Sequence, residues 1–250
     1  MTGERWAAVA FDLDGTLVDL ERFHHEAWLR AARDVGVELT WKQAFQRLPN
    51  FIGGPDARVA AQIADLAPGG ADPAGTLTAK GRWFSALIGA VDTIVPRAGV
   101  CDAVEGLCAR GVPVAVATAT ERGTALTILH RSGLLPLFGV ARVVTAHDVS
   151  RLKPAPDAYR ITAARLCVPP SVQLVFEDSV TGMTAARAAG SQVVAMPTVP
   201  DRAYLASVDA VGPAAVFRSW RDPGLADLLD RVLPADAAAS AGRGAAGVTR

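Results

Sequence analysis

The sequence predicts an α/β protein in which helices flank a Rossmann-like parallel sheet and an α-helical cap domain is inserted after the first strand. Three observations support this fold class. An apolar run over residues 6–11 ends in two carboxylates. From residue 112 onward strand and helix patterns alternate, as a parallel sheet requires. Between them, residues 20–91 contain helical patterns and no good strand.

The first strand is predicted at Trp6–Phe11, because a continuous apolar run suits a strand buried on both faces of a parallel sheet. Asp12 and Asp14 follow at its carboxyl end, where open α/β sheets bind ligands. If the strand continues through them, both carboxylates point the same way. Gly15 then lets the chain turn. Such acids can hold Mg²⁺, attack phosphorus or move a proton; the alternative is a solvated strand end.

The segment after the first strand contains four predicted helices, at 21–35, 40–48, 56–66 and 78–91. The second opens with Thr40 and Gln43 in a capping-box pattern. A helical insert in a Rossmann-like core indicates a lid with hinges near residues 18–20 and 92–97. We therefore expect a core of residues 1–18 and 92–234, a helical cap of residues 19–91, and a disordered tail of residues 235–250.

The remaining elements alternate along the core. Strands are predicted at 112–118, 142–145, 172–177, 193–196 and 214–217, and helices at 121–132, 155–166, 179–189 and 223–232. Gly133 and Gly190 end two of these helices. Asp222 and Pro223 supply the N-cap and first turn of the last helix.

Composition argues against several functional classes. The formal net charge is zero, so nucleic acid is not an expected partner. No apolar run reaches the roughly 18 residues of a membrane span, and no membrane partner is expected. The first strand starts too early to leave room for a signal peptide. Cys101, Cys108 and Cys167 lack metal-ligand spacing, so buried free thiols in a cytoplasmic monomer or weak dimer are expected, with a disulfide or catalytic thiol as alternatives.

Polar residues also follow the other predicted strands. Thr118 and Thr120 precede a helix start, where hydroxyl and amide groups can bind an anion; capping of the helix by Thr120 is the alternative. Lys153 lies in a loop and is one of three lysines beside 22 arginines. Arginine does not replace lysine well where a compact ammonium is needed, although a loop lysine can also be merely solvated. Glu177 and Asp178 end another strand or cap the next helix.

Four motifs in this order make the chain resemble the haloacid dehalogenase superfamily, in the capped subgroup of β-phosphoglucomutase and sugar-phosphate phosphatases. The motifs are Asp12-x-Asp14-Gly-Thr, Thr118, Lys153-Pro154-x-Pro156-Asp157, and Glu177-Asp178-Ser179-x-x-Gly182. The resemblance extends over nearly all of residues 6–200. It implies the expected core and cap, and a phosphoryl-transfer site at the edge of the sheet.

The resemblance also implies roles for these residues. Asp12 would be the nucleophile that forms an aspartyl-phosphate, and Asp14 the general acid and base. Thr118 and Lys153 would hold the phosphoryl oxygens. Mg²⁺ would be bound by Asp12, the Asp14 carbonyl and Asp178, with Glu177 close by. Carboxylate nucleophiles and hard oxygen ligands for Mg²⁺ suit this chemistry.

Substrate-binding residues are expected at His24, Lys80, Thr120, Gly53 and Arg58. His24 and Lys80 match mutase-like positions in the cap; surface helix residues are the alternative. In the mutase, an arginine three residues after a cap glycine binds the distal phosphate. Counting from Gly53, this chain has Asp56, and Arg58 lies two residues beyond. An acid there would repel a second phosphate, which favours a hydrolase over a mutase.

The resulting hypothesis is a Mg²⁺-dependent phosphatase that hydrolyses a small phosphorylated metabolite, such as a sugar phosphate, through an aspartyl-phosphate. A β-phosphoglucomutase-type mutase and a non-catalytic protein that binds a phosphorylated metabolite are the alternatives. The dehalogenase and phosphonate-cleaving branches are disfavoured, because their chemistry does not use the second aspartate of the first motif. This chain has that residue as Asp14.

Overall fold

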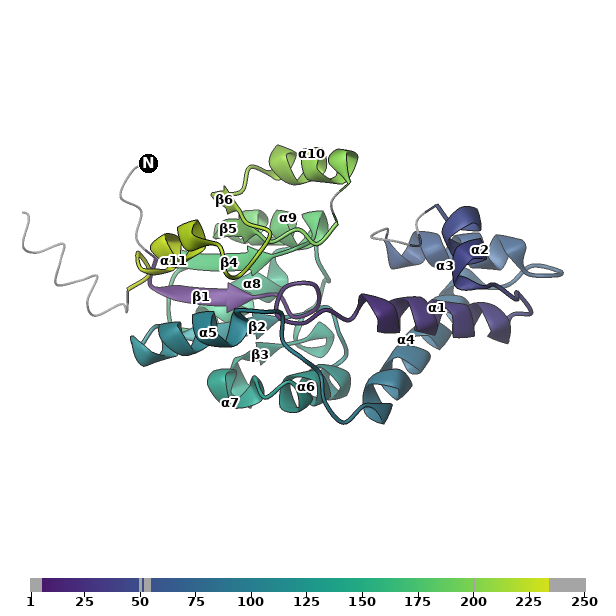
Figure 1. The fold of residues 1–250 in the computed structure, drawn as a ribbon, viewed down its shortest axis with the longest axis horizontal. Helices are drawn as coiled ribbons and strands as arrows, with labels where there is room; N and C mark the ends of the chain where they lie inside the picture. The colour runs from purple at the N-terminus through teal and green to yellow at the C-terminus, as the bar shows by residue number, and fades with distance from the viewer. Residues whose placement is uncertain (1–5, 50, 52–54, 200, 234–250) are drawn as a thin grey trace, which may run out of the picture. The chain divides into compact units, whose positions relative to one another are not determined.

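The computed structural model describes residues 6–49, 51, 55–199 and 201–233, and these form two compact units (Figure 1). The core unit contains the described residues up to Asp19 and from Thr93 onward, and the helical unit is Leu20–Asp92. The core and cap boundaries expected from the sequence, 18/19 and 91/92, differ from these by one residue. The tail expected at 235–250 lies outside the described residues.

The core unit is built on a six-stranded parallel sheet. Its strands are β1 (Ala8–Phe11), β2 (Val114–Ala117), β3 (Val143–Val144), β4 (Gln173–Glu177), β5 (Gln192–Ala195) and β6 (Ala215–Val216). Their order is β3-β2-β1-β4-β5-β6, and all neighbours are parallel. Phe11 of β1 lies opposite Val116 on one side and Phe176 on the other. The predicted fold class is confirmed.

Helices form a layer on each face of this sheet. One layer contains α8 (Asp157–Arg165), α9 (Val180–Ala189) and α10 (Arg202–Val211); the other contains α5 (Val100–Ala109), α6 (Arg122–Arg131), α7 (Leu135–Phe138) and α11 (Pro223–Leu229). Short 3-10 helices occur at Val140–Arg142, Ala146–Asp148 and Pro170–Val172. Because both faces are covered, β1, β2 and β4 are fully buried, which explains their apolar runs.

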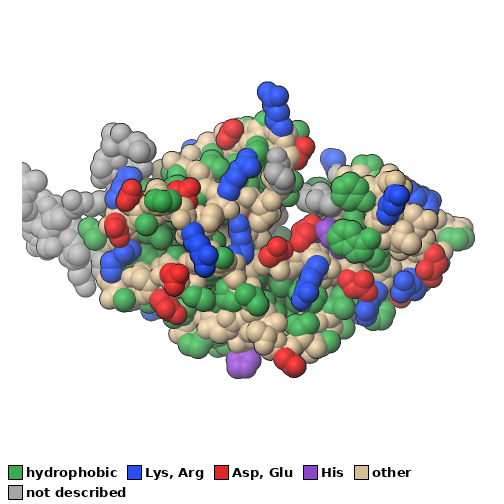
Figure 2. All heavy atoms as spheres, viewed as in Figure 1, with side chains coloured by type: hydrophobic (Ala, Val, Ile, Leu, Met, Phe, Trp, Pro, Cys, Tyr) green, Lys and Arg blue, Asp and Glu red, His purple; other side chains and the backbone are tan. Residues whose placement is uncertain are grey.

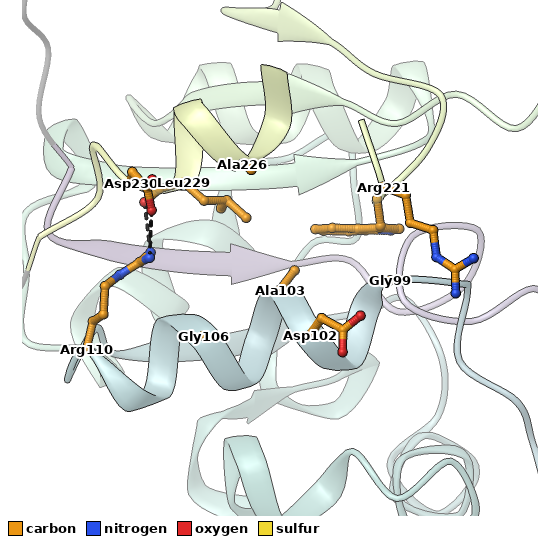
Figure 3. Close-up of a pocket in the computed structure, with 10 residues that line it drawn as sticks. Gly99, Asp102, Ala103, Gly106, Arg110, Arg221, Ala226, Leu229 and Asp230 are labelled. Atoms are coloured by element: carbon orange, nitrogen blue, oxygen red, sulfur yellow. Dashed lines mark hydrogen bonds and ion pairs between the residues drawn. The ribbon is translucent and has the colours of Figure 1, made fainter. Parts of the chain in front are cut away.

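A cavity of about 280 Å³ is lined by residues of α5 and α11 (Figure 3). Arg110 donates hydrogen bonds across it to Asp230 Oδ1 at 3.0 Å and to the Leu229 carbonyl at 2.9 Å. Gly99 opens α5 with φ +95°, and a Cβ atom there would meet Trp220 at 3.0 Å. Glycine at this position therefore allows the start of α5 to pack closely on the backbone and Cβ of Trp220.

The helical unit contains α1 (Glu21–Asp34), α2 (Trp41–Arg47), α3 (Asp56–Leu66) and α4 (Pro73–Ala90). α1 and α3 both pack on α4, and their apolar faces enclose a core that includes Trp28, Leu48 and Ile63. The capping box predicted at the start of α2 is confirmed, because Thr40 and Gln43 bond each other's backbone N–H groups.

Some elements differ from the sequence-based expectation. The helices α5, α7 and α10 had no predicted counterpart, and α4 begins at Pro73 rather than at residue 78. Asp72 accepts hydrogen bonds from the amides of Ala74 and Gly75. Asp72-Pro73 is thus the same N-cap and first-turn signal that predicted the start of α11, and it extends α4 by more than one turn.

The surface of the protein carries charges of both signs (Figure 2), as the zero net charge leads one to expect. On the face shown in Figure 2, acidic and basic side chains are interspersed with apolar ones. Within the described part of the chain, no helix combines the length and apolarity that crossing a membrane requires.

All three cysteines are free, but the expectation that they are buried is wrong. Cys167 is exposed, and Cys101 and Cys108 are partly exposed.

A buried polar network ties α8 to β4. The Gln173 side chain is fully buried; its Oε1 accepts a hydrogen bond from Thr162 Oγ1 at 2.9 Å. Its Nε2 donates to the Tyr159 carbonyl and to Ser191 Oγ, both at 3.0 Å. Since both donors and the acceptor of this amide are used, the network can fix α8 on the sheet without leaving a buried polar group unpaired.

Thr162→Val should lower the free energy of unfolding by about 1–3 kcal/mol, because it leaves the buried Gln173 Oε1 without its donor. The matched control is Thr127→Val on α6, where the hydroxyl bonds the Gly123 carbonyl near solvent and the change should stay within about 0.5 kcal/mol. Urea denaturation of both variants measures the difference. Equal losses would show that the buried network does not contribute to stability.

Candidate active site

Three carboxylates meet at the carboxyl edge of β1 and β4, where the strand order reverses. Asp12 directly follows β1, Glu177 is the last residue of β4, and Asp178 comes next. One carboxylate oxygen from each lies within 4.8 Å of the other two. In the described ranges, this is the group of acidic residues with the spacing of a metal site. It lies where open α/β sheets bind ligands.

Lys153 joins this cluster from the loop that follows β3. Its Nζ lies 2.5 Å from Asp12 Oδ1 and 2.6 Å from Glu177 Oε1, and it also donates to the Ala117 carbonyl at 3.1 Å. The Lys153 side chain is only 8% exposed. The alternative of a solvated loop lysine is therefore wrong, and the ammonium instead links the ends of β1, β2 and β4.

Both carboxylate oxygens of Glu177 accept hydrogen bonds. Tyr159 on α8 donates to Oε1 at 2.8 Å, while the backbone N–H and hydroxyl of Ser179 donate to Oε2, both at 3.0 Å. Ser179 also caps α9 by accepting from the Gly182 amide. A Cβ atom at Gly182 would lie 1.6 Å from Glu177 Oε1. Glycine is therefore required there so that α9 can start against the carboxylate.

The loop after β1 approaches the same cluster. Gly15 has φ +81°, and a Cβ atom there would lie 2.2 Å from Asp178 Oδ2. Thr16 Oγ1 donates to Asp178 Oδ1 at 3.3 Å. Because β1 ends at Phe11, the strand does not continue through Asp14, so the alternation argument for the two aspartates does not apply. Asp14 lies in this loop, partly exposed, and its carboxylate is not one of the three grouped above.

Burial and like charge shape the electrostatics of the cluster. Burial and the neighbouring carboxylates raise the pKa of Asp12 and of Asp178, against the opposing effect of Lys153. Burial alone would lower the pKa of Lys153, but Asp12 and Glu177 outweigh it and hold that pKa above its usual value. Three carboxylates and one ammonium leave a formal charge of −2, which is costly in a buried site.

The donor set therefore fits a hard divalent cation. Asp12, Glu177 and Asp178 offer clustered carboxylate oxygens, the ligand type that Mg²⁺ prefers, and a charge of +2 would balance the cluster. Burial raises the pKa values of Asp12 and Asp178, and the neighbouring carboxylates raise them further against the opposing effect of Lys153, so a cation at this site would favour their ionised forms.

Thr118 follows β2 at the same edge and is buried. Its Oγ1 accepts from the Thr120 amide at 3.1 Å, which leaves the hydroxyl hydrogen free to donate to an anion. The alternative in which Thr120 caps the next helix is wrong. Glu121 is the N-cap of α6 and takes the amides of Gly123 and Thr124. These two amides are thus occupied by a carboxylate, so they do not supply the anion site expected at this helix start.

The expected cap residues belong to the helical unit. Lys80 is 5% exposed, and its Nζ lies 2.8 Å from Asp56 Oδ2 and over the rings of Trp28 and Phe84. The alternative of a solvated helix lysine is therefore wrong for Lys80. His24 stacks on Phe84 with ring centroids 4.1 Å apart.

Arg58 lies on the first turn of α3 and is exposed. The expectation for Gly53 falls outside the described residues.

Sequence reasoning missed several residues of this site. Tyr159 bonds Glu177, and Tyr204 on α10 donates its hydroxyl to the Asp178 carbonyl at 2.6 Å. They are the two tyrosines of the chain, so the scarcity argument that singled out Lys153 could have pointed to them as well. Thr16 and Ser179 lie within the motifs, but only their contacts with Asp178 and Glu177 show what they do.

Comparison with known proteins shows which family the chain resembles. Residues 6–190 match the family of haloacid dehalogenase-like hydrolases. The fructose-1-phosphate phosphatase YqaB of Escherichia coli is 34% identical over 191 residues, which cover 76% of this chain and 96% of that protein. The validoxylamine A 7'-phosphate phosphatase of Streptomyces hygroscopicus subsp. limoneus is 35% identical over 202 residues, covering 80% and 90%.

A solved structure of a similar protein has a similar fold. CbbY from Rhodobacter sphaeroides, in complex with xylulose-(1,5)bisphosphate, superposes with a TM-score of 0.69 at 26% identity, covering 88% of this chain and 96% of that one. The family match extends over well more than half of the chain and includes all four motifs. The chain therefore belongs to the haloacid dehalogenase-like hydrolase family.

Proposed function

We propose that this protein is a Mg²⁺-dependent phosphoric monoester hydrolase that acts on a small phosphorylated metabolite of the sugar-phosphate class. The observation that carries the proposal is the buried contact of Asp12 with Lys153 beside Glu177 and Asp178. Two relatives, a fructose-1-phosphate phosphatase and a validoxylamine A 7'-phosphate phosphatase, support the substrate class.

In the proposed first step, Asp12 attacks the phosphorus of the bound ester. Lys153 holds Asp12 Oδ1 at 2.5 Å, which leaves Oδ2 as the attacking oxygen. The Asp12 O–P bond forms as the ester P–O bond breaks, and Asp14 gives its proton to the leaving alkoxide. Lys153 and the hydroxyl of Thr118 stabilise negative charge on the phosphoryl oxygens, which is the main requirement of phosphoryl transfer.

In the proposed second step, water hydrolyses the aspartyl-phosphate. Asp14, now ionised, takes a proton from the attacking water, the Asp12 O–P bond breaks, and inorganic phosphate leaves. Asp14 suits both steps because it lies on a loop beside the cluster and remains partly exposed, whereas Asp12 is buried. A partly exposed acid can exchange protons with solvent between turnovers.

A bound Mg²⁺ would be held by Asp12, Asp178 and the Asp14 carbonyl, with Glu177 close by. It would supply positive charge that lets a phosphate dianion approach a carboxylate. Thr16, Tyr159 and Ser179 keep the carboxylates of Asp178 and Glu177 in place.

We also propose that the helical unit acts as the cap and that His24, Lys80 and Arg58 contact the substrate. The Lys80 contact with Asp56 supports hydrolysis rather than mutase chemistry. A mutase must hold a bisphosphate, which requires an uncompensated cation for the second phosphate. Lys80 is already paired with a carboxylate at 2.8 Å, so this ammonium is better suited to a neutral, hydroxyl-bearing end of a monophosphate.

Asp12→Asn should abolish turnover while the fold is retained, because the amide cannot act as the nucleophile. EDTA should stop the wild-type enzyme, and Mg²⁺ should restore it. Phosphate release and circular dichroism measure activity and fold. Asp102→Asn on α5 is the matched control and should keep wild-type activity. Substantial turnover by the Asp12 variant would remove Asp12 from the mechanism.

Lys153→Arg should reduce kcat by about 10²-fold or more, although the charge is kept. Lys153 Nζ fits among four oxygens within 3.1 Å, and a planar guanidinium is too large for that space. Lys42→Arg, at an exposed position on α2, is the control and should leave kcat unchanged. If both variants behave alike, the compact ammonium is not what the site requires.

The enzyme should release inorganic phosphate from a monophosphate without a bisphosphate activator. The deciding assay incubates it with β-glucose 1-phosphate and a trace of the 1,6-bisphosphate, and follows free phosphate and glucose 6-phosphate together. We expect any product to be free phosphate, because Asp56 compensates Lys80. Efficient formation of glucose 6-phosphate with little free phosphate would identify a mutase instead.

A further inference from the structure

Three consecutive backbone carbonyls of the loop after β1 accept hydrogen bonds from residues outside all four motifs. The Arg97 guanidinium donates to the Gly15 carbonyl, and the Arg97 backbone N–H donates to the Leu17 carbonyl at 2.9 Å. Between them, Trp220 Nε1 donates to the Thr16 carbonyl at 3.0 Å. Arg97 and Trp220 lie far apart in the sequence, so the loop is held by two separate parts of the chain.

Trp220 is itself rigidly held. Its side chain is 6% exposed, and its ring lies 5.8 Å from that of Phe11 and 5.0 Å from that of Phe176. These two phenylalanines stack on each other and immediately precede Asp12 and Glu177. The indole therefore fixes the Thr16 carbonyl relative to the two strand ends that carry the carboxylate cluster.

Arg97 connects the same loop to its surroundings. The preceding residue, Pro96, forms a β-bridge with Val18, and the Arg97 guanidinium also reaches the Met196 carbonyl after β5 at 3.5 Å. Its charge interacts with Asp178 and Asp19. Arg97 thus joins the loop after β1 to the loop after β5, whereas Lys153 comes from the loop after β3, on the other side of β1 in the sheet.

We propose that Arg97 and Trp220 are positioning residues that hold the loop of residues 13–18, so that Asp14 and Thr16 keep their places beside Asp12 and Asp178. This role rests on the proposed hydrolase function. Loss of either donor leaves a loop carbonyl without its partner and lets the loop shift. A general acid that is misplaced by about 1 Å slows the chemical step by up to about 10²-fold.

The test compares two disruptive variants with two matched controls and adds one conservative variant. Trp220→Phe removes the Nε1 donor and keeps an aromatic ring, and Trp6→Phe makes the same change at an equally buried tryptophan beside Arg231. Arg97→Gln removes the guanidinium, and Arg110→Gln does so at the arginine after α5 that bonds the Leu229 carbonyl (Figure 3). Arg97→Lys, which keeps the charge and a donor, should restore part of the activity.

Two readouts separate this role from general destabilisation. Hydrogen exchange of the loop amides needs no substrate and is therefore independent of activity. The amides of Leu17 and Val18 are suitable probes, because both donate to the Leu13 carbonyl within the loop. In Trp220→Phe and Arg97→Gln their exchange should be about tenfold faster than in wild type. For the best phosphate ester found, kcat should fall about 10- to 100-fold with KM changed less than about twofold. Both controls should match wild type in both readouts.

Unchanged loop exchange in the two variants would overturn the proposal whether or not a substrate is known. Faster exchange with an unchanged kcat would also overturn it, because the loop would then be held without consequence for catalysis. A wild-type protein that hydrolyses no phosphate ester would instead contradict the proposed function, while the exchange data would still decide whether Arg97 and Trp220 hold the loop.

Discussion

The contact of the Lys153 ammonium with Asp12 and Glu177 is the interaction on which the site depends. Buried charges are costly unless they are paired at close range. Here the lysine arrives from the loop after β3 and the two acids from the ends of β1 and β4. The pairing therefore requires these strand ends to meet at one edge, which the order β3-β2-β1-β4 provides. Strand order and site chemistry are thus linked through one ammonium group.

The charge balance also explains much of the surrounding structure. Because the cluster keeps a formal charge of −2 after Lys153 is counted, each carboxylate needs further donors or a cation. Ser179 and Tyr159 supply donors to Glu177, and Thr16 supplies one to Asp178. Gly15 and Gly182 allow backbone to approach carboxylates where any side chain would collide. The presence of glycine at these two motif positions follows from this crowding.

The lysines show what can be learned from the rarity of a residue type in this sequence. Of the three in the chain, Lys153 and Lys80 are buried against carboxylates, whereas Lys42 is exposed. The same argument, applied to the two tyrosines, would have found two more residues beside the acidic cluster. It could not have identified Arg97, which is one of 22 arginines, or shown that Asp56 is the partner of Lys80.

The sequence by itself determined the fold class, the strands of the core and the four motif positions, because buried parallel strands and the residues at their ends follow local patterns. Only the tertiary structure decided which groups touch. It ended β1 before Asp14, placed Glu121 rather than Thr120 at the start of α6, and brought Arg97 and Trp220 to adjacent carbonyls. Such contacts join residues up to 204 positions apart, and no local pattern records them.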